Sequence, residues 1–279
     1  MPIFIILLII FGLVGAVNIA DYRMRQRVKQ EANSLFQNAA GQPVDVFQHD
    51  SLSHLPPPVQ HYLKRCVPDG YPLIKTVRLE QTGSISSNSG TSWFPFSAVQ
   101  YFTAQPKGFV WLAYGRMLPL VWVFVRDKYI AGEGNMLIKP ESLITLADAK
   151  GPELDQGSLA RYLAEMMWFP TAFVDDSLRW ESIDDHHARV TIHDHDIEFT
   201  MTITFTESGD IAQVEGLRYR DSDGEDAQPI CWGGKVISYN TFNDVRIPSE
   251  VEVYWNPPGS YEPYWRGTIT AASYNTSEL

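Results

Sequence analysis

The chain has little of what marks a disulfide scaffold, a zinc protein or a nucleic-acid-binding protein. Its 279 residues include two cysteines, Cys66 and Cys231, which are too few for a disulfide framework and lack zinc-ligand spacing. They either form one disulfide or stay as two separate buried thiols, and we favour the separate thiols. Lys and Arg total 22 against 33 Asp and Glu, for a formal net charge of −11. Because phosphate contacts need clustered basic residues, we expect no nucleic acid partner.

Sequence motifs of common enzymes and cofactor sites are also missing. The chain has no Gly-x-Ser-x-Gly nucleophile turn, no glycine-rich phosphate loop and no His-Glu-x-x-His zinc motif. Gly132-Glu133-Gly134 lacks the third glycine and the following helix of a dinucleotide-binding loop. These absences predict a chain without a cofactor, and they favour a protein that is not an enzyme.

Two polar segments resemble metal sites only superficially. His193-Asp194-His195-Asp196 offers ligands for a divalent ion, but it lies between two strand-like segments and reads as an exposed hairpin tip. Asp221-Ser222-Asp223-Gly224-Glu225-Asp226 departs from a calcium loop, which needs glycine at its sixth position and glutamate at its twelfth. We therefore expect no metal site in either segment.

One long apolar run is present, at the N-terminus. Residues Met1 to Val17 carry no charge, and a basic flank follows, made of Arg23, Arg25, Arg27 and Lys29. These seventeen residues are at the lower limit for a membrane-spanning helix, and residues 18–20 can extend the run. A cleaved signal peptide is the alternative, but such a peptide usually begins with basic residues, and none precedes Phe11. We expect residues 1–20 to be an uncleaved, single-pass membrane anchor.

The basic flank also bears on the side of the membrane that the rest of the chain occupies. Lys and Arg beside a spanning helix tend to stay in the cytoplasm, which favours a cytoplasmic domain. Their charge suits anionic lipid headgroups better than any other partner.

Beyond the anchor, the pattern divides into a juxtamembrane segment and one domain. Residues 21–54 read as a helix with a sparse apolar stripe followed by a linker, and residues 55–279 read as a single β-rich globular domain. Pro56-Pro57-Pro58 opens a short helix, and from Tyr71 the apolar period changes from helical to two. About eleven strand candidates follow, separated by turn residues and without an internal repeat.

One longer helix interrupts these strands. Apolar residues recur at helical spacing from Leu159 to Met167, with a start at Pro152 or Asp155 and a stop at Pro170. Strands around a single helix predict an α+β fold: a large curved antiparallel sheet, or half-open barrel, wrapped around the helix. Such a sheet must be closed or covered on its apolar face.

The helix region resembles a bacterial membrane-anchored family of uncharacterised function. The resemblance rests on Gly151-Pro152-Glu153-Leu154-Asp155-Gln156-Gly157, Arg161-Tyr162-Leu163-Ala164-Glu165 and Trp168-Phe169-Pro170-Thr171-Ala172, and it extends over roughly residues 55–274. It implies a location in the bacterial cytoplasmic (inner) membrane and carries over no catalytic residues. The architecture is also similar to the lipoprotein-carrier (LolA-like) half-barrel, which implies an apolar cavity and a place outside the cytoplasm. That conflicts with the basic flank, so the side of the membrane stays open.

Aromatic residues are abundant, with 8 Trp, 13 Tyr and 14 Phe. Large rings on the inner face of a curved sheet suit acyl chains, although most rings in a domain only fill its core. We expect an apolar ligand to be bound by Phe109, Trp111, Trp122, Tyr162, Met166, Trp168 and Trp265.

Together these features predict a membrane-tethered binding or carrier domain for a lipid or other apolar ligand. One alternative is a hydrolase-type enzyme that uses Glu153, Asp155 and Arg161, because paired carboxylates can act as general acid and base. The competing structural interpretation is helix capping and surface pairing, since Arg161 and Glu165 are four residues apart. A second alternative is an envelope interaction module without a ligand.

Overall fold

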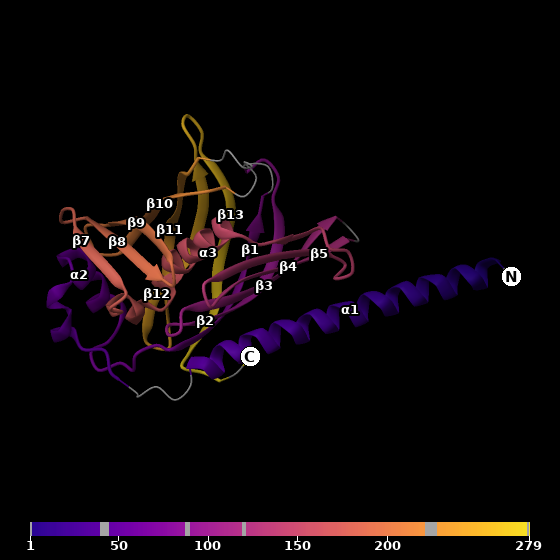
Figure 1. Cartoon of the computed structure of the whole chain (residues 1–279), viewed down its shortest axis with the longest axis horizontal. Helices are drawn as coiled ribbons and strands as arrows, with labels where there is room; N and C mark the ends of the chain where they lie inside the picture. Colours follow the sequence, from indigo (N-terminus) through magenta and orange to yellow (C-terminus); the bar gives the residue numbers. More distant parts are fainter. Residues whose placement is uncertain (1, 40–44, 87–89, 119–120, 221–227, 278) are drawn as a thin grey trace.

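The body of the protein is a thirteen-stranded antiparallel sheet (Figure 1). The computed structural model describes residues 2–39, 45–86, 90–118, 121–220, 228–277 and 279. The sheet order is β6-β5-β4-β3-β2-β1-β13-β12-β11-β10-β9-β8-β7, so two meanders are joined edge to edge by the pairing of β1 with β13. The predicted α+β fold with a curved sheet around one helix is confirmed.

The strands are β1 (Thr76–Ile85), β2 (Phe94–Thr103), β3 (Gly108–Leu118), β4 (Val121–Ile130), β5 (Glu133–Pro140), β6 (Ala147–Ala149), β7 (Leu178–Ser182), β8 (His187–Asp194), β9 (Ile197–Phe205), β10 (Ile211–Arg218), β11 (Ile230–Phe242), β12 (Val245–Asn256) and β13 (Glu262–Tyr274). The helices are α1 (Pro2–Ala39), α2 (Pro57–Cys66) and α3 (Pro152–Glu165), with 3-10 turns η1 (His49–His54), η2 (Met166–Trp168) and η3 (Pro170–Val174). The sequence did not predict β6, because three residues are too few to show a period.

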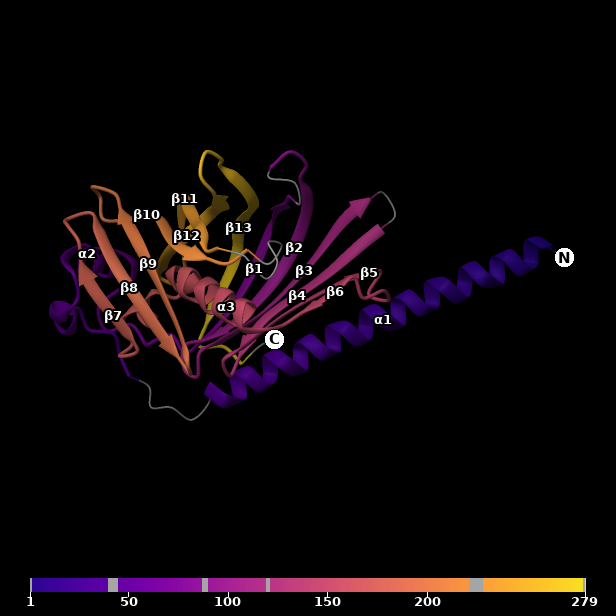
Figure 2. The same cartoon turned by 45° about the horizontal axis from the view of Figure 1, so that its top comes forward.

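Helix α3 lies inside the curve of the sheet (Figure 2). Its apolar stripe, which includes Leu159, Tyr162 and Leu163, is buried in the main core. Each such side chain contributes about 1.5–3 kcal/mol through burial. The Tyr162 hydroxyl donates a hydrogen bond to the Thr103 carbonyl oxygen at 2.8 Å, which ties α3 to the end of β2. The helix gives way to the tighter turn η2 before Pro170, where a helix stop was expected.

The second half of α1 covers the outer face of the same sheet. Met24, Val28 and Ala32 belong to a second apolar cluster with β2, β3 and β4, and Leu35 lies so close to Gly108 that a Cβ there would be 2.7 Å from its Cδ1. Strand β3 is therefore buried on both faces, which explains why its sequence is apolar at nearly every position.

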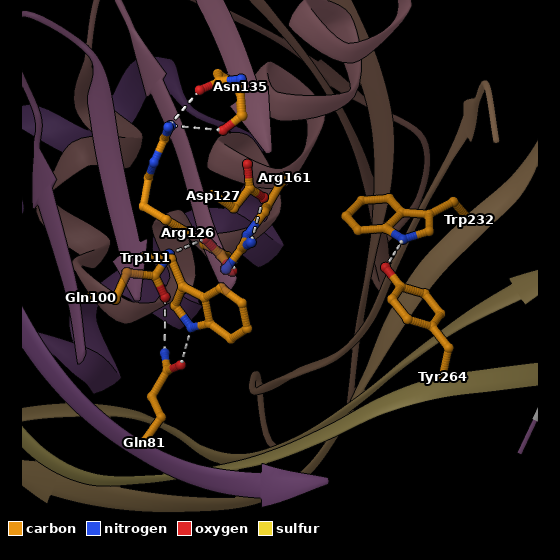
Figure 3. A network of polar contacts seen from close by, with 10 residues as sticks. Gln81, Gln100, Trp111, Arg126, Asp127, Asn135, Arg161, Trp232 and Tyr264 are labelled. Carbon is orange, nitrogen blue, oxygen red and sulfur yellow. Dashed lines mark hydrogen bonds and ion pairs between the residues drawn. The ribbon is translucent and has the colours of Figure 1, made fainter. Parts of the chain in front are cut away.

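A partly buried carboxylate reinforces this contact. Glu31 of α1 lies 3.5 Å from Arg126 Nε and 3.1 Å from Lys128 Nζ, both on the outer face of β4. Burial lowers the pKa of Arg126 and the Glu31 charge counteracts that effect. Arg126 also donates to the Asn135 side-chain oxygen at 2.6 Å (Figure 3). Helix α1 is thus attached to the domain by charge as well as by apolar packing.

The segment expected to be a linker also packs onto the domain. Phe47 and Leu52 are buried in the main core. Val46 forms a bridge with Pro72. Among the described residues, the chain between α1 and α2 therefore follows the surface of the domain from residue 45 onward.

We expect Glu31→Gln to loosen α1 from the sheet, because Arg126 and Lys128 lose the carboxylate that balances them. The free energy of unfolding should fall by about 2 kcal/mol, a typical value for hydrogen bonds to charged groups. Urea unfolding of the full chain in detergent, with hydrogen exchange of residues 24–39, measures both effects. Glu181→Gln, which breaks a half-exposed pair with Arg189, is the control and should cost less than about 0.5 kcal/mol. Equal losses in the two variants would contradict the role given to Glu31.

Candidate functional site

The side of α3 opposite its apolar stripe carries a polar row. Gly157, Arg161 and Glu165 are spaced by four residues and so share one face of the helix. Arg161 is the centre of this row. Its Nη1 donates to Asp127 Oδ2 at 2.7 Å, and its Nε donates to Glu165 Oε1 at 2.9 Å. Its guanidinium also lies 4.9 Å from the ring centroid of Phe109.

A hydrogen-bonded chain of side chains continues from this ion pair across three strands. Gln100 donates to Glu165 at 2.7 Å, Gln81 donates to Gln100 at 2.9 Å, and Trp111 Nε1 donates to Gln81 at 2.8 Å (Figure 3). The chain returns to its origin, because the Trp111 ring also lies 4.9 Å from the Arg161 guanidinium. We name Arg161, Asp127, Glu165, Gln100, Gln81 and Trp111 the inner polar network.

The electrostatics of this network favour a charged arginine. Burial by itself lowers the pKa of Arg161. The charges of Glu165 and Asp127 raise this pKa by more than burial lowers it, so the net shift is upward. Burial raises the pKa of Glu165, while Arg161 and Gln100 act in the opposite direction. One arginine is paired directly with two carboxylates, so these three side chains carry one net negative charge, and their hydrogen bonds hold α3 in place.

The three residues of the enzyme hypothesis, Glu153, Asp155 and Arg161, do not come together in one site. Glu153 is exposed at the start of α3. Asp155 accepts a hydrogen bond from the Gly134 backbone N–H at 2.7 Å and so fixes the β4–β5 hairpin. Arg161 instead meets Asp127 and Glu165. Sequence reasoning missed Asp127 as a partner, although a single acid between the two cations Arg126 and Lys128 in β4 was an available signal.

A second arginine lies beside this network without a direct ion-pair partner among the described residues. Arg218, at the end of β10, is 8% exposed. Its guanidinium lies 4.9 Å from the ring centroid of Trp232 and 5.6 Å from that of Trp255. Within the described part of the chain it has no ion-pair partner, and its Nε has no hydrogen-bond acceptor. An unpaired cation at such burial is costly unless something else compensates it.

A glycine in α3 makes room for this arginine. A Cβ at Gly157 would lie 2.8 Å from both Nε and Nη2 of Arg218. The neighbouring Trp232 Nε1 donates to the Tyr264 hydroxyl at 2.9 Å (Figure 3). The guanidinium is therefore held between α3 and the two tryptophans of β11 and β12.

The seven residues expected to bind an apolar ligand fall into three groups. Five of them are buried in the main core around α3, namely Phe109, Trp111, Tyr162, Met166 and Trp168. Trp265 on β13 is only partly buried, with its ring centroid 5.8 Å from that of Phe96. Trp122 lies on the opposite, outer face of β4, where it is 39% exposed and stacked on Tyr114. Only the first two groups share the concave face.

The accessible part of the concave face lies on strands β1, β11, β12 and β13. Ile85 pairs with Trp265, and Trp265 pairs with Val253 in the next strand. These three residues, with Ile230 and Tyr264, are partly buried and pack against the main core. We name Ile85, Ile230, Val253, Tyr264 and Trp265 the aromatic rim. Ile230 pairs with Arg218, so the rim adjoins the unpaired arginine.

Metal and thiol chemistry find little support in the described residues. They contain no group of three or more His, Cys, Asp or Glu side chains arranged to hold a metal ion. His195 sits in the turn between β8 and β9, as expected for a hairpin tip, while segment 221–226 lies outside the described residues. Both cysteines are free thiols. Burial raises the pKa of Cys66 to about 12 and that of Cys231 to about 11, so both are protonated at neutral pH.

We expect Arg161→Gln to destabilise the domain, because two buried carboxylates would remain without their cation. The loss should be about 3–5 kcal/mol, the range found when one partner of a buried pair is removed. Urea unfolding followed by near-UV circular dichroism measures it. Glu153→Gln on the same helix serves as the control and should stay within about 0.5 kcal/mol of the natural chain. A similarly small loss in Arg161→Gln would contradict this assignment.

Comparison with known proteins finds a family and several solved structures of low identity. The family of unknown function DUF6544 matches residues 45–267. No curated protein matches the chain. A DUF1329 family protein from Desulfovibrio piger is similar over 74% of this chain and 88% of its own, with 10% identity and a TM-score of 0.43. A candidate outer membrane lipoprotein-sorting protein domain from Vibrio parahaemolyticus (74% and 87%, 8% identity, TM-score 0.42) and a LolA superfamily protein from Nitrosomonas europaea (82% and 94%, 8% identity, TM-score 0.38) are also similar. The function therefore has to be inferred from the residues of this chain.

Proposed function

We propose that this chain, which belongs to the DUF6544 family of unknown function, is a membrane-tethered binding or carrier domain for a lipid or other apolar ligand. The observation that carries the proposal is the aromatic rim beside a buried, unpaired arginine on the concave face of the sheet. The rim supplies apolar surface, and Arg218 supplies a cation that has no direct ion-pair partner among the described residues.

The tether is supported by the composition and exposure of α1. The helix contains an apolar window with mean hydropathy 2.4, none of which is buried against the domain. About 20 apolar residues suffice to cross the hydrocarbon core of a bilayer. In water, a helix with this much exposed apolar surface would be strongly unfavourable. We infer that residues 1–20 are embedded in the bacterial cytoplasmic membrane.

The rim and Arg218 together fit an amphiphile better than a purely apolar molecule. Aromatic and aliphatic side chains such as Trp265 and Ile85 favour an acyl chain. A guanidinium forms paired hydrogen bonds with carboxylate or phosphate, and the low local dielectric strengthens them. We therefore expect an anionic amphiphile to bind more tightly than a neutral one with the same chain.

The buried residues have a different role in this proposal from the rim. Phe109 and Trp111 pack in the main core with helix α3, which contributes Tyr162, and with the following turn η2, which contributes Met166 and Trp168. In this proposal, these five residues lie in the core below the rim. A ligand contacts them only if helix α3 moves. Trp122 faces away from this site and is not part of it.

Binding at the rim can be tested with a fluorescent fatty acid and with lipid extracted from the purified full chain. We expect co-purified lipid, and we expect Trp265→Ala to weaken fatty-acid binding about tenfold, equivalent to 1.4 kcal/mol. Trp122→Ala, on the other face, is the matched control and should leave binding unchanged. If no lipid co-purifies and the natural chain binds the probe no better than Trp265→Ala does, the proposal is wrong.

The preference for an anionic headgroup gives a separate prediction. Arg218→Met should weaken binding of the fatty acid about tenfold or more while leaving the corresponding alcohol unaffected, because only the carboxylate pairs with the guanidinium. Arg218→Lys keeps the charge and should restore part of the loss. Competition with acid and alcohol of equal chain length measures the difference. Equal affinities for both in the natural chain would contradict a role for Arg218 in headgroup recognition.

A further inference from the structure

A separate cavity of about 590 Å³ lies on the outer side of the domain, between α1 and the connection from β5 to β6. Its lining residues are Ala16, Ile19, Ala20, Arg23, Met24 and Arg27 from α1, with Lys139, Ser142 and Leu143 from the domain. The cavity therefore spans the point at which the apolar part of α1 gives way to its basic flank.

Three of the lining side chains are cations. Arg23 and Lys139 have no ion-pair partner among the described residues, while Arg27 lies 3.6 Å from Glu31. That carboxylate is already shared with Arg126 and Lys128. Asp21 is bound by Arg25 at 2.8 Å and accepts a hydrogen bond from the lining residue Ser142 at 3.4 Å, while Asp148 interacts electrostatically with Arg27. The lining residues themselves include three cations and no carboxylate.

The connection from β5 to β6, which we name the lip of the cavity, exposes apolar side chains and is held in place by hydrogen bonds. Leu143, Ile144 and Leu146 are 44%, 65% and 64% exposed. Their connection is held at both ends, since the Leu146 N–H donates to the Ile138 carbonyl at 2.9 Å and the Trp122 N–H donates to Glu141 at 2.7 Å. Exposed leucine and isoleucine side chains clustered in this way mark a surface that meets a partner or a membrane.

The geometry of α1 relates this lip to a bilayer. The lip lies at the end of the sheet toward which the first half of α1 extends (Figure 1). The stretch from Ala16 to Arg27 rises about 16 Å along the helix, longer than the headgroup layer is thick. Exposed Tyr22 and Trp122 lie in the same region, and such rings favour the membrane–water interface.

We propose that this cavity binds the headgroup of an anionic phospholipid from the bilayer that α1 spans. The lipid phosphate lies between Arg23 and Lys139, and its acyl chains run along Ile19 and Leu143 into the hydrocarbon. Leu143 and Ile144 enter the same leaflet, so lipid and lip together set the tilt of the domain on the membrane. The proposal rests on the membrane tether of the proposed function but not on the rim.

The test uses the full chain in nanodiscs of phosphatidylcholine with one fifth phosphatidylglycerol, with the lipids retained by the protein counted by native mass spectrometry. We expect phosphatidylglycerol to be enriched on the natural chain and the enrichment to fall about fivefold or more in the double variant Arg23→Gln, Lys139→Gln. The matched control is Lys64→Gln, Arg179→Gln, which removes two exposed charges elsewhere on the domain. Thermal unfolding of each variant checks that the fold is kept.

A second measurement follows the lip itself. An environment-sensitive dye at Ile144→Cys, in a Cys231→Ser background, should shift to the blue in nanodiscs, while the same dye at Arg179→Cys should not. Equal retention of both lipids by the natural chain, or an equal loss of enrichment in the control, overturns the headgroup site while leaving the tether and the rim intact. If the emission of the dye at residue 144 does not shift to the blue, Leu143 and Ile144 do not enter the leaflet, and that part of the proposal is wrong. A chain that fails to enter nanodiscs overturns the cavity proposal and the tether together, while fatty-acid binding at the rim can still be measured.

Discussion

The pairing of β1 with β13 is the contact on which the rest of the structure depends. It joins residues as far apart in the chain as Val77 and Tyr274, and it makes one continuous sheet from two meanders whose other pairings are between neighbours in sequence. Closing so long a loop costs conformational entropy that only the completed sheet offsets. Without it there is no concave face, because Gln81 and Trp265 come from the two strands that meet there.

The concave face separates two uses of buried charge. Arg161 is paired with Asp127 and Glu165, and its network holds α3 against β1 to β4. Arg218 is just as deeply placed but lies against tryptophan rings with no carboxylate beside it among the described residues. A directly paired buried charge holds structural elements together, whereas a buried cation without a direct partner is stabilised when an anion binds beside it. This contrast is the physical reason for placing the proposed ligand at the rim.

Helix α1 gives the domain a fixed relation to the apolar first half of that helix. A flexible tether would let the domain rotate freely above a membrane, but here the second half of the helix is part of the core through Val28, Ala32 and Leu35. Any bilayer that holds the first half of α1 therefore constrains the orientation of the sheet. The exposed lip near Leu143 and the aromatic rim are then held at set positions relative to the membrane surface.

The sequence alone determined the elements and the class of fold, since helical and strand periods are local properties that mark where α3 and most strands lie. It also identified Arg161 as a member of a polar cluster. It did not identify Asp127 as the partner of Arg161, the outward face of Trp122, or the lack of an ion-pair partner for Arg218 among the described residues. All three depended on tertiary structure for the same reason. The alternation of a strand shows that neighbouring side chains on β4 face opposite ways. Because β4 is covered on both sides, its sequence alone does not show which of the two faces is the inner one. Only the long-range register of the sheet, with α3 on one face and α1 on the other, decided that.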